Sequence, residues 1–548
     1  MRIIIKSVLA IGCLSLCVLL GSCKGITEDG KQEAGDWIES RQETDNATES
    51  RNGHGEEALD SERQSEGQTL SGEEGGGGES PPGEEGRTGG KGQSEGAYFR
   101  EGKQDWAEEG SFGVTPQQGE KTEAQSAKEL EEQKEEIPLP KTYDLRKTGR
   151  VPAIKNQGEL GTCWAFASLT ALESSLLPED NYDFSEDNMS LNHNFLLGQE
   201  DGGDYTMSMA YLVSWQGPVL EEKDPYGDKK TPSGLTAVRH VQEIQILPEK
   251  DFDCIKQAIL DIGGVQSSLY TSMKNPGSES EYYNKETAAY YYDGKESPNH
   301  DSVIIGWDDT YPKENFSSPP PGDGAFLCMN SWGTGFGKDG CFYVSYYDTN
   351  IGVHNIVYTV TELPDNYDRI YQSDLCGWIG QLGYGQDTAW FANVYEAKEE
   401  EMLKAVGFYA TGPNTSYEIY TAVDVKAPGN SAEKNMEEGT EKKTGRKDMF
   451  SGMVKAGEGK MDYAGYYTIP LDKKVDLKKG ERFAVIVRIK TPGAVHPVAI
   501  EYDAQDGKCS IDLNDGEGYI SVQGDLWDSA EEKQECNICL KAYTEEKK

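Results

Sequence analysis

A stretch of 113 residues that lacks any hydrophobic pattern constrains this chain most. Residues 24–136 are rich in Glu, Gly, Ser and Gln, and they contain 30 acidic and 12 basic residues. Such a segment cannot bury enough apolar surface to offset the entropy lost on ordering, and its like charges repel. We therefore expect 24–136 to be an extended, disordered linker. The folded part of the 548-residue chain must then lie after it.

The overall charge excludes one class of partner. The formal net charge is −43 at pH 7, and the phosphate backbone of a nucleic acid repels so acidic a chain. No nucleic acid partner is therefore expected.

The first 23 residues have the pattern of an export signal. Arg2 and Lys6 precede an apolar run that ends in LGSC at 20–23, and this run is too short for a typical membrane-spanning helix. The ending resembles the bacterial lipoprotein signal, in which the cysteine is acylated and becomes the new N-terminus. The resemblance implies a signal peptide over 1–23, a lipid anchor on Cys23 and a membrane-anchored protein at the bacterial cell surface. A plain signal peptide and an uncleaved anchor are the alternatives.

A cysteine begins a predicted helix within KNQGELGTCWAFAS at 155–168. Apolar residues at helical spacing predict a helix of about four turns from Cys163, with Thr162 as its cap and Pro178 as its stop. The positive end of the helix dipole favours a thiolate at Cys163, as a nucleophile requires. Gln157, in the turn before, can donate its amide to an oxyanion. A buried structural cysteine is the alternative.

The segment around Cys163 closely resembles the nucleophile region of papain-like cysteine peptidases. That family requires a histidine before a buried strand, and NHDSVIIGW at 299–307 places His300 137 residues after Cys163, inside the expected interval of roughly 130–150. FLCMNSWGTGFG at 326–337 then supplies Asn330 and Trp332 in family order. The other five histidines lack such a context and are interpreted as surface or core residues.

The resemblance implies a role for each matching residue. Cys163 is the nucleophile, Gln157 helps to stabilise the oxyanion, His300 is the acid and base, and Asn330 orients His300. Further positions are implied to contact substrate, and they are Gly202, Gly203, Pro298, Asp301 and Trp332. A protonated His300 is expected to join the helix dipole in lowering the pKa of Cys163 well below the usual value of about 8.5.

The same resemblance defines the first folded domain, 137–362, with a helical left half and a β-barrel-like right half on either side of a cleft. One position departs from the family, because Leu160 stands where a disulfide-bonded cysteine is common. The left half is therefore expected to depend on packing.

The remaining residues, 366–548, contain many short alternating segments, among them TAWFANVYEA, EEMLKAVGFYAT, ERFAVIVRIK and NICLKAYT. This pattern predicts an antiparallel β-sandwich that folds alone, so the fold class is α+β followed by an all-β domain. The region resembles the lectin-like domain that follows papain-like peptidase domains in some bacterial surface proteins. A carbohydrate or cell-wall ligand does not follow from that fold, and it stays open.

Two short motifs suggest a metal or redox site without meeting the requirements of one. Cys536 and Cys539 lie in a predicted terminal strand, where positions three apart point to opposite faces, and no second Cys or His pair accompanies them. DLNDGEGY at 512–519 lacks the full spacing of a calcium loop and is interpreted as a turn. No metal and no cofactor are predicted.

Three hypotheses follow for function. The favoured one is a surface-anchored cysteine endopeptidase that acts on polypeptides. The second is an adhesin or glycan-binding protein with a vestigial peptidase domain, although an inactive enzyme would be expected to have lost one of the four catalytic groups. The third is an exopeptidase, which would need an element that blocks the cleft, and the sequence offers no candidate for it.

Overall fold

The computed structural model describes residues 138–426, 446–447, 449–505 and 507–547. The predicted signal peptide, the predicted anchor Cys23 and the predicted linker 24–136 lie outside these residues, as does most of the charged segment 429–448. Within the described ranges, no helix is both long and apolar enough to cross a membrane.

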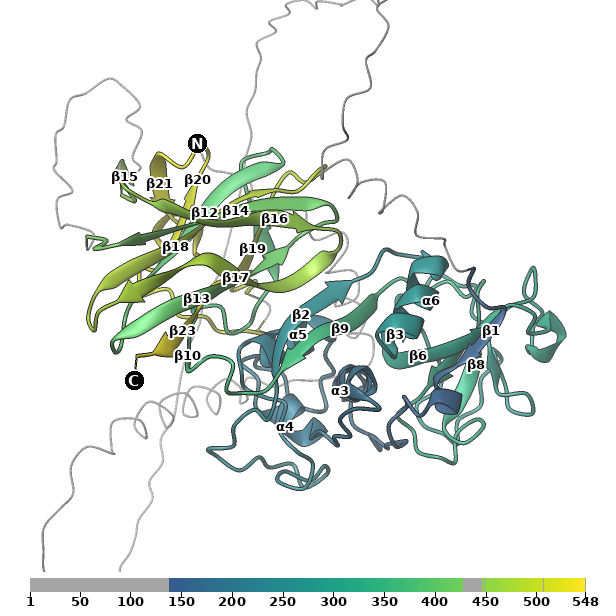
Figure 1. The fold of residues 1–548 in the computed structure, drawn as a ribbon. Helices are drawn as coiled ribbons and strands as arrows, with labels where there is room; N and C mark the ends of the chain where they lie inside the picture. The colour runs from purple at the N-terminus through teal and green to yellow at the C-terminus, as the bar shows by residue number, and fades with distance from the viewer. Residues whose placement is uncertain (1–137, 427–445, 448, 506, 548) are drawn as a thin grey trace, which may run out of the picture. The chain divides into compact units, whose positions relative to one another are not determined.

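Helices gather in the first domain (Figure 1). They are α3 Cys163–Leu176, α4 Glu186–Leu191, α5 Tyr205–Val213 and α6 Phe252–Asp261, with the short 3-10 helices η2 Leu145–Thr148 and η3 Lys313–Asn315. Helix α3 has the predicted start and the predicted length of about four turns, and nearly all of its side chains are buried. Thr162 occupies the predicted N-cap position, but its side chain makes no capping hydrogen bond. Its hydroxyl instead pairs with the hydroxyl of Tyr226 at 2.6 Å.

The strands of the first domain form one sheet in the order β2-β9-β3-β6-β7-β8-β5-β4, and β1 pairs with β6. Their bounds are β1 Thr142–Asp144, β2 His240–Ile246, β3 Val265–Leu269, β4 Tyr283–Asn284, β5 Ala289–Tyr290, β6 His300–Asp308, β7 Ala325–Met329, β8 Cys341–Ser345 and β9 Asn355–Glu362. Helix α3 packs against β3, β6 and β9 of this sheet. The start of α3 and the start of β6 are thereby brought together.

The second domain consists almost entirely of antiparallel strands (Figure 1). One sheet has the order β15-β21-β20-β12-β18-β14-β16, a second contains β10-β23-β13-β17, and a third contains β11-β19-β22. The bounds are β10 Arg369–Tyr371, β11 Gly380–Leu382, β12 Thr388–Glu396, β13 Glu401–Ala410, β14 Thr415–Val423, β15 Arg446–Lys447, β16 Val454–Met461, β17 Ala464–Leu477, β18 Arg482–Lys490, β19 Val498–Tyr502, β20 Gly518–Ser521, β21 Leu526–Ser529, β22 Cys536–Ile538 and β23 Leu540–Glu546. A single turn of helix, α7 Ala530–Gln534, interrupts them.

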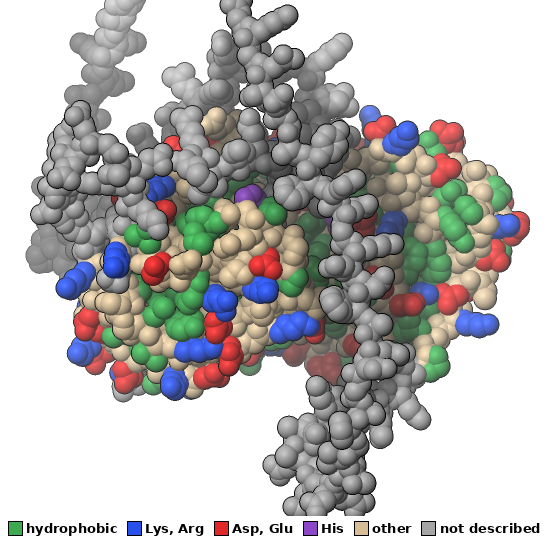
Figure 2. All heavy atoms as spheres, turned by 90° about the horizontal axis from the view of Figure 1, so that it is seen from above, with side chains coloured by type: hydrophobic (Ala, Val, Ile, Leu, Met, Phe, Trp, Pro, Cys, Tyr) green, Lys and Arg blue, Asp and Glu red, His purple; other side chains and the backbone are tan. Residues whose placement is uncertain are grey.

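Apolar faces of these sheets form a main core, to which Phe408, Val487 and Leu540 contribute from different strands. A smaller apolar cluster includes Ile486 and Trp527. This arrangement of sheets is the predicted sandwich, and the predicted fold class is confirmed. Acidic and basic side chains are interspersed on the face of the protein shown in Figure 2.

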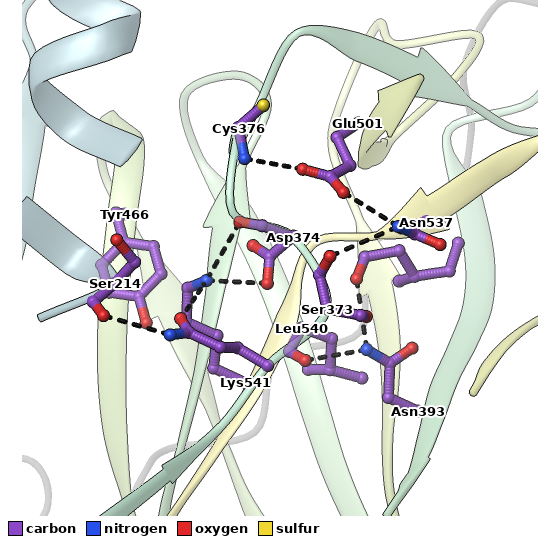
Figure 3. A network of polar contacts seen from close by, with 12 residues as sticks. Ser214, Ser373, Asp374, Cys376, Asn393, Tyr466, Glu501, Asn537, Leu540 and Lys541 are labelled. Carbon is purple, nitrogen blue, oxygen red and sulfur yellow. Dashed lines mark hydrogen bonds and ion pairs between the residues drawn. The ribbon is translucent and has the colours of Figure 1, made fainter. Parts of the chain in front are cut away.

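The two domains share a sheet. Strand β17 of the second domain pairs with β2 of the first over four residues, from Ala464 opposite Ile246 to Tyr467 opposite Glu243. This pairing joins the two smaller sheets into one of 13 strands. Figure 3 shows the polar network beside it. There Gln372 Nε2 donates to the carbonyl of Ser214 at 3.0 Å.

Candidate active site

His300 and Asn330 meet at the ends of neighbouring strands. His300 is the first residue of β6, and Asn330 directly follows the last residue of β7, the strand that pairs with β6. The imidazole Nε2 of His300 lies 2.8 Å from Oδ1 of Asn330, and both side chains are buried. The indole of Trp332 lies beside the imidazole, with 4.9 Å between the ring centroids, and is itself buried. Nδ1 is therefore the imidazole nitrogen left for another partner.

Cys163 is the first residue of α3, and the backbone N–H groups of Asp301, Trp164 and Cys163 itself act to lower the pKa of its thiol. Because Asp301 follows His300 directly, this influence of Asp301 places the sulfur near the start of β6. The structure thus brings the predicted nucleophile and the predicted base together.

Burial changes the proton affinity of Cys163 and of His300. It raises the pKa of the Cys163 thiol to about 12, to which the carboxylate of Asp301 contributes, while the three N–H donors act in the opposite direction. Burial also lowers the pKa of His300, against the effects of the Asn330 hydrogen bond and the Asp301 charge. The helix dipole and a protonated His300 are predicted to lower the pKa of Cys163, and the effect of burial opposes them.

A charged pair can still form, because the two groups can ionise together. Each burial effect opposes a single isolated charge. Transfer of the proton from Cys163 to His300 creates both charges at once, and their mutual attraction offsets the cost of desolvating each. We therefore expect Cys163 to depend on His300 for its ionisation.

Gln157 is held against the Asn330 segment by backbone pairing. Its N–H donates to the carbonyl of Ser331 at 2.8 Å, and Asn156 forms a β-bridge with Trp332. On the side chain, Oε1 accepts from the Ser331 hydroxyl at 2.6 Å, and Nε2 donates to the carbonyl of Leu160 at 2.8 Å. A primary amide has two N–H donors, so one remains for a substrate oxygen.

The predicted substrate-contacting residues lie around these groups. Gly202 has a φ of +82°, and its backbone lies so near Gly161 that a side chain on Gly161 would meet it. A side chain on Gly203 would collide with the indole of Trp164, the neighbour of Cys163. Pro298 is half-buried in the loop before β6, and Asp301 is buried.

The other described histidines have structural surroundings, as predicted. His193 packs against Trp164, and burial lowers its pKa to about 4. His240 stacks on Trp215 with 3.8 Å between the ring centroids.

Sequence reasoning missed an ionic group near the site, which we call the Lys155 cluster, in which Glu173 and Glu186 are buried and Asp183 is exposed. Lys155 Nζ contacts one carboxylate oxygen each of Glu173, Asp183 and Glu186 at 2.8–2.9 Å. The carbonyl of Lys155 accepts from the N–H of Gly333 at 2.9 Å, so the cluster supports the strand pairing that positions Gln157. The sequence does contain one sign of this cluster, because Glu173 is a charged residue within the apolar stripe of α3.

Within the described residues, no group of three or more His, Cys, Asp or Glu side chains is placed to hold a metal ion.

Comparison with known protein families accounts for both domains. The model of the papain family of cysteine proteases matches residues 139–361, and that of the lectin-like domain matches residues 370–544. The chain therefore carries a papain-family cysteine protease domain followed by a lectin-like domain.

Two known relatives each match a little more than a third of this chain. Cysteine proteinase 1 of Entamoeba histolytica is 28% identical over 219 residues, and cathepsin K of Mus musculus is 27% identical over 215 residues. Each match covers 37% of this chain, and it spans 63% and 58% of the two relatives, respectively.

Solved structures match both domains. The clostridial cysteine protease Cwp84 after propeptide cleavage has a TM-score of 0.63 and 27% identity, over 74% of this chain and 99% of that one. A structure of the cysteine protease and lectin-like domains of Cwp84, a surface layer associated protein of Clostridium difficile, gives 0.61 and 26%, over 75% and 90%.

Proposed function

We propose that this protein is a cysteine endopeptidase that hydrolyses polypeptides with Cys163 as its nucleophile. The observation that carries the proposal is the arrangement of three groups: a thiol at the start of α3 that lies near the backbone N–H of Asp301, a histidine directly before Asp301 in the chain, and an asparagine 2.8 Å from that histidine. Family membership of the domain supports the same reaction class.

The proposed reaction has two stages. The proton of Cys163 passes to His300, and the sulfur attacks the peptide carbonyl carbon. The free N–H of Gln157 and the backbone N–H of Cys163 stabilise the oxyanion. His300 then protonates the leaving amine as the C–N bond breaks, which leaves a thioester. His300 next activates water to attack the thioester, and the carboxylic acid product leaves as the thiol forms again.

Digestion of a peptide library by the full chain tests this proposal. We expect internal cleavage by the wild type and none by Cys163→Ala, which removes only the sulfur. Cleavage that persists in Cys163→Ala would refute the assignment of the nucleophile. Release of single terminal residues would favour an exopeptidase.

We further propose that a lipid on Cys23 holds the protein at the bacterial surface membrane. The LGSC sequence at 20–23 supports this, and the similar protein Cwp84 is described as surface layer associated. Labelled fatty acid should enter the wild type in a bacterial host but not Cys23→Ala. If the wild type takes up no label, the anchor is wrong.

The lectin-like domain is proposed to present or select targets, with a carbohydrate or cell-wall polymer as its candidate ligand. Its membership of the lectin-like family supports this. Binding of the full chain to a glycan array would establish the ligand class. Failure to bind a broad array would leave protein targets as the remaining partners.

A further inference from the structure

Asp301 is a buried carboxylate beside the candidate nucleophile, and within the described residues it forms no ion pair with a lysine or arginine. It is 7% exposed, and both its backbone N–H and its charge act on the thiol of Cys163. Its Oδ2 accepts from Gln266 Nε2 at 3.0 Å, while Oδ1 accepts no hydrogen bond from any side chain described. A buried carboxylate is costly unless a cation pairs with it.

The nearby basic groups in the protein are already engaged. Lys155 shares a small cavity with Asp301, but its ammonium is surrounded by the three carboxylates of the Lys155 cluster. His300 points its Nε2 at Asn330, and His354 pairs through Nδ1 with the hydroxyl of Ser268 at 3.3 Å. This leaves the carboxylate of Asp301 available to a cation from outside.

Residues of both halves of the domain surround this carboxylate. Ser268 lies directly opposite Asp301 in the pairing of β3 with β6. The charge of Asp301 also acts on Tyr205, the first residue of α5, whose ring lies 5.4 Å from that of His354. Tyr205 follows Gly203 by two residues. A substrate backbone held along Gly202 and Gly203 would therefore direct a side chain toward Asp301.

We propose that Asp301 is the specificity-determining residue of this site and selects a substrate residue with a cationic side chain, arginine or lysine, on the amino-terminal side of the cleaved bond. This inference rests on the proposed function, because it assigns a substrate class to the same site. An arginine fits the polar surroundings best, since its planar guanidinium can bond to Oδ1 of Asp301 and also stack on an aromatic ring such as Tyr205.

The test measures peptide binding, so that it does not depend on cleavage. In the full chain with Cys163→Ala, fluorescence anisotropy compares a peptide containing arginine with the same peptide containing citrulline, which has nearly the same shape but no charge. We expect the arginine peptide to bind at least about tenfold more tightly, as a close charged contact in a partly desolvated site provides. A positional library identifies the responsible substrate residue.

Asp301→Asn is the matched variant, because asparagine keeps the size of the side chain and an oxygen to accept from Gln266. In this variant the two peptides should bind equally. Asp301→Ala gives a second measurement if the asparagine variant does not fold, and circular dichroism checks both. Equal binding of the two peptides by the Cys163→Ala protein, or discrimination that survives both Asp301 substitutions, would overturn the inference.

The outcomes separate the two proposals. If Cys163→Ala discriminates between the peptides and the wild type cleaves neither, the inference holds and the proposed peptidase activity fails. If the wild type cleaves peptides without a preference for arginine or lysine, the peptidase holds and the role of Asp301 fails.

Discussion

The candidate active site and the junction between the two domains each contain a buried lysine, but the surrounding charges differ. Lys155 is shared by three carboxylates. At the junction, Lys541 pairs with one, Asp374, at 2.7 Å, and both side chains are fully buried. Lys541 also donates to Gln372 at 2.9 Å, and these three residues are called the Lys541 cluster (Figure 3). The Lys155 cluster therefore has a surplus of carboxylates, whereas the Lys541 pair is balanced.

This difference makes the Lys155 cluster sensitive to pH. Burial raises the pKa of Glu173 to about 7 and that of Glu186 to about 8, against the lowering effect of Lys155. Between the ordinary glutamate pKa and these values, the folded protein binds more protons than the unfolded chain does. Its stability therefore falls as the pH rises through this range. We therefore expect removal of the lysine to change the stability of the folded protein differently in the two clusters.

The largest expected effect concerns the reactive pair of the active site. His300→Ala removes the base that we propose takes the proton of Cys163, so the thiol should keep the high pKa that burial imposes. At pH 5.5 we expect alkylation of Cys163 by iodoacetamide to slow by about a thousandfold or more, because the thiolate is the reacting form. Mass-spectrometric mapping of labelled peptides measures the rate.

Cys254 is the control for this experiment. It is half-buried, its thiol contacts Tyr463, and both residues are remote from His300 in the sequence. Its rate should be the same in both proteins. Equal labelling of Cys163 in wild type and variant would contradict the paired ionisation.

Removal of each buried lysine compares the two clusters directly. Lys155→Met and Lys541→Met should each lower the free energy of unfolding by about 3–5 kcal/mol, because each leaves a carboxylate buried without its cation. The loss for Lys155→Met should grow more between pH 5 and pH 8 than the loss for Lys541→Met, since it leaves more carboxylates behind. Urea unfolding at both pH values measures this.

A double variant sharpens the test. Adding Glu186→Gln to Lys155→Met removes one of the stranded carboxylates and should recover part of the stability at pH 8, but little at pH 5. Equal pH dependence of the two lysine variants would show that the number of carboxylates does not matter.

The active site and the junction also differ in how far the sequence could predict them. Cys163, His300 and Asn330 each lie in a short segment whose neighbours carry the family resemblance, so their identity and order were readable. The Lys541 cluster could not be predicted, because Gln372, Asp374 and Lys541 come from segments without a motif, and a lysine in a terminal strand gives no sign of burial.

Whether a strand could be predicted also depended on its local sequence pattern. Strands β12, β13 and β18 alternate clearly and were predicted, whereas β16 Val454–Met461 was missed because VKAGEGKM contains glycines and charges. The pairing of β17 with β2 joins segments more than 200 residues apart, and no local pattern encodes such a register. That the second domain folds alone therefore stays a prediction. A fragment of residues 366–548 that unfolds cooperatively on heating would support it.

A smaller effect is expected from one carboxylate at the junction. Burial raises the pKa of Glu501 to about 8, while its two oxygens accept from Asn537 Nδ2 at 2.8 Å and from the N–H of Cys376 at 2.7 Å. A raised pKa contributes stability at low pH that is lost as the pH rises through about 8. Glu501→Gln, which cannot ionise, should have a melting temperature a few degrees above that of the wild type at pH 9, and no higher at pH 5. Thermal unfolding followed by circular dichroism decides this, and identical pH curves would contradict it.

The smallest expected effects come from two substitutions, one in the active site and one at the junction, each of which removes a hydrogen-bonding side chain. Ser331→Ala removes the hydroxyl that holds Oε1 of Gln157 at 2.6 Å, so the amide loses its orientation toward the substrate oxygen. We expect kcat to fall by about fivefold, the equivalent of one hydrogen bond of about 1 kcal/mol, with KM and the melting temperature nearly unchanged. Gln372→Met removes both the bond to the carbonyl of Ser214 and the bond accepted from Lys541. It should do the reverse, lowering the melting temperature while kcat stays the same. Since both variants remove a polar side chain that hydrogen-bonds across two segments, a fall in kcat in both would mean that the junction positions the catalytic groups. A fall in stability alone in both would mean that Ser331 has no part in positioning Gln157.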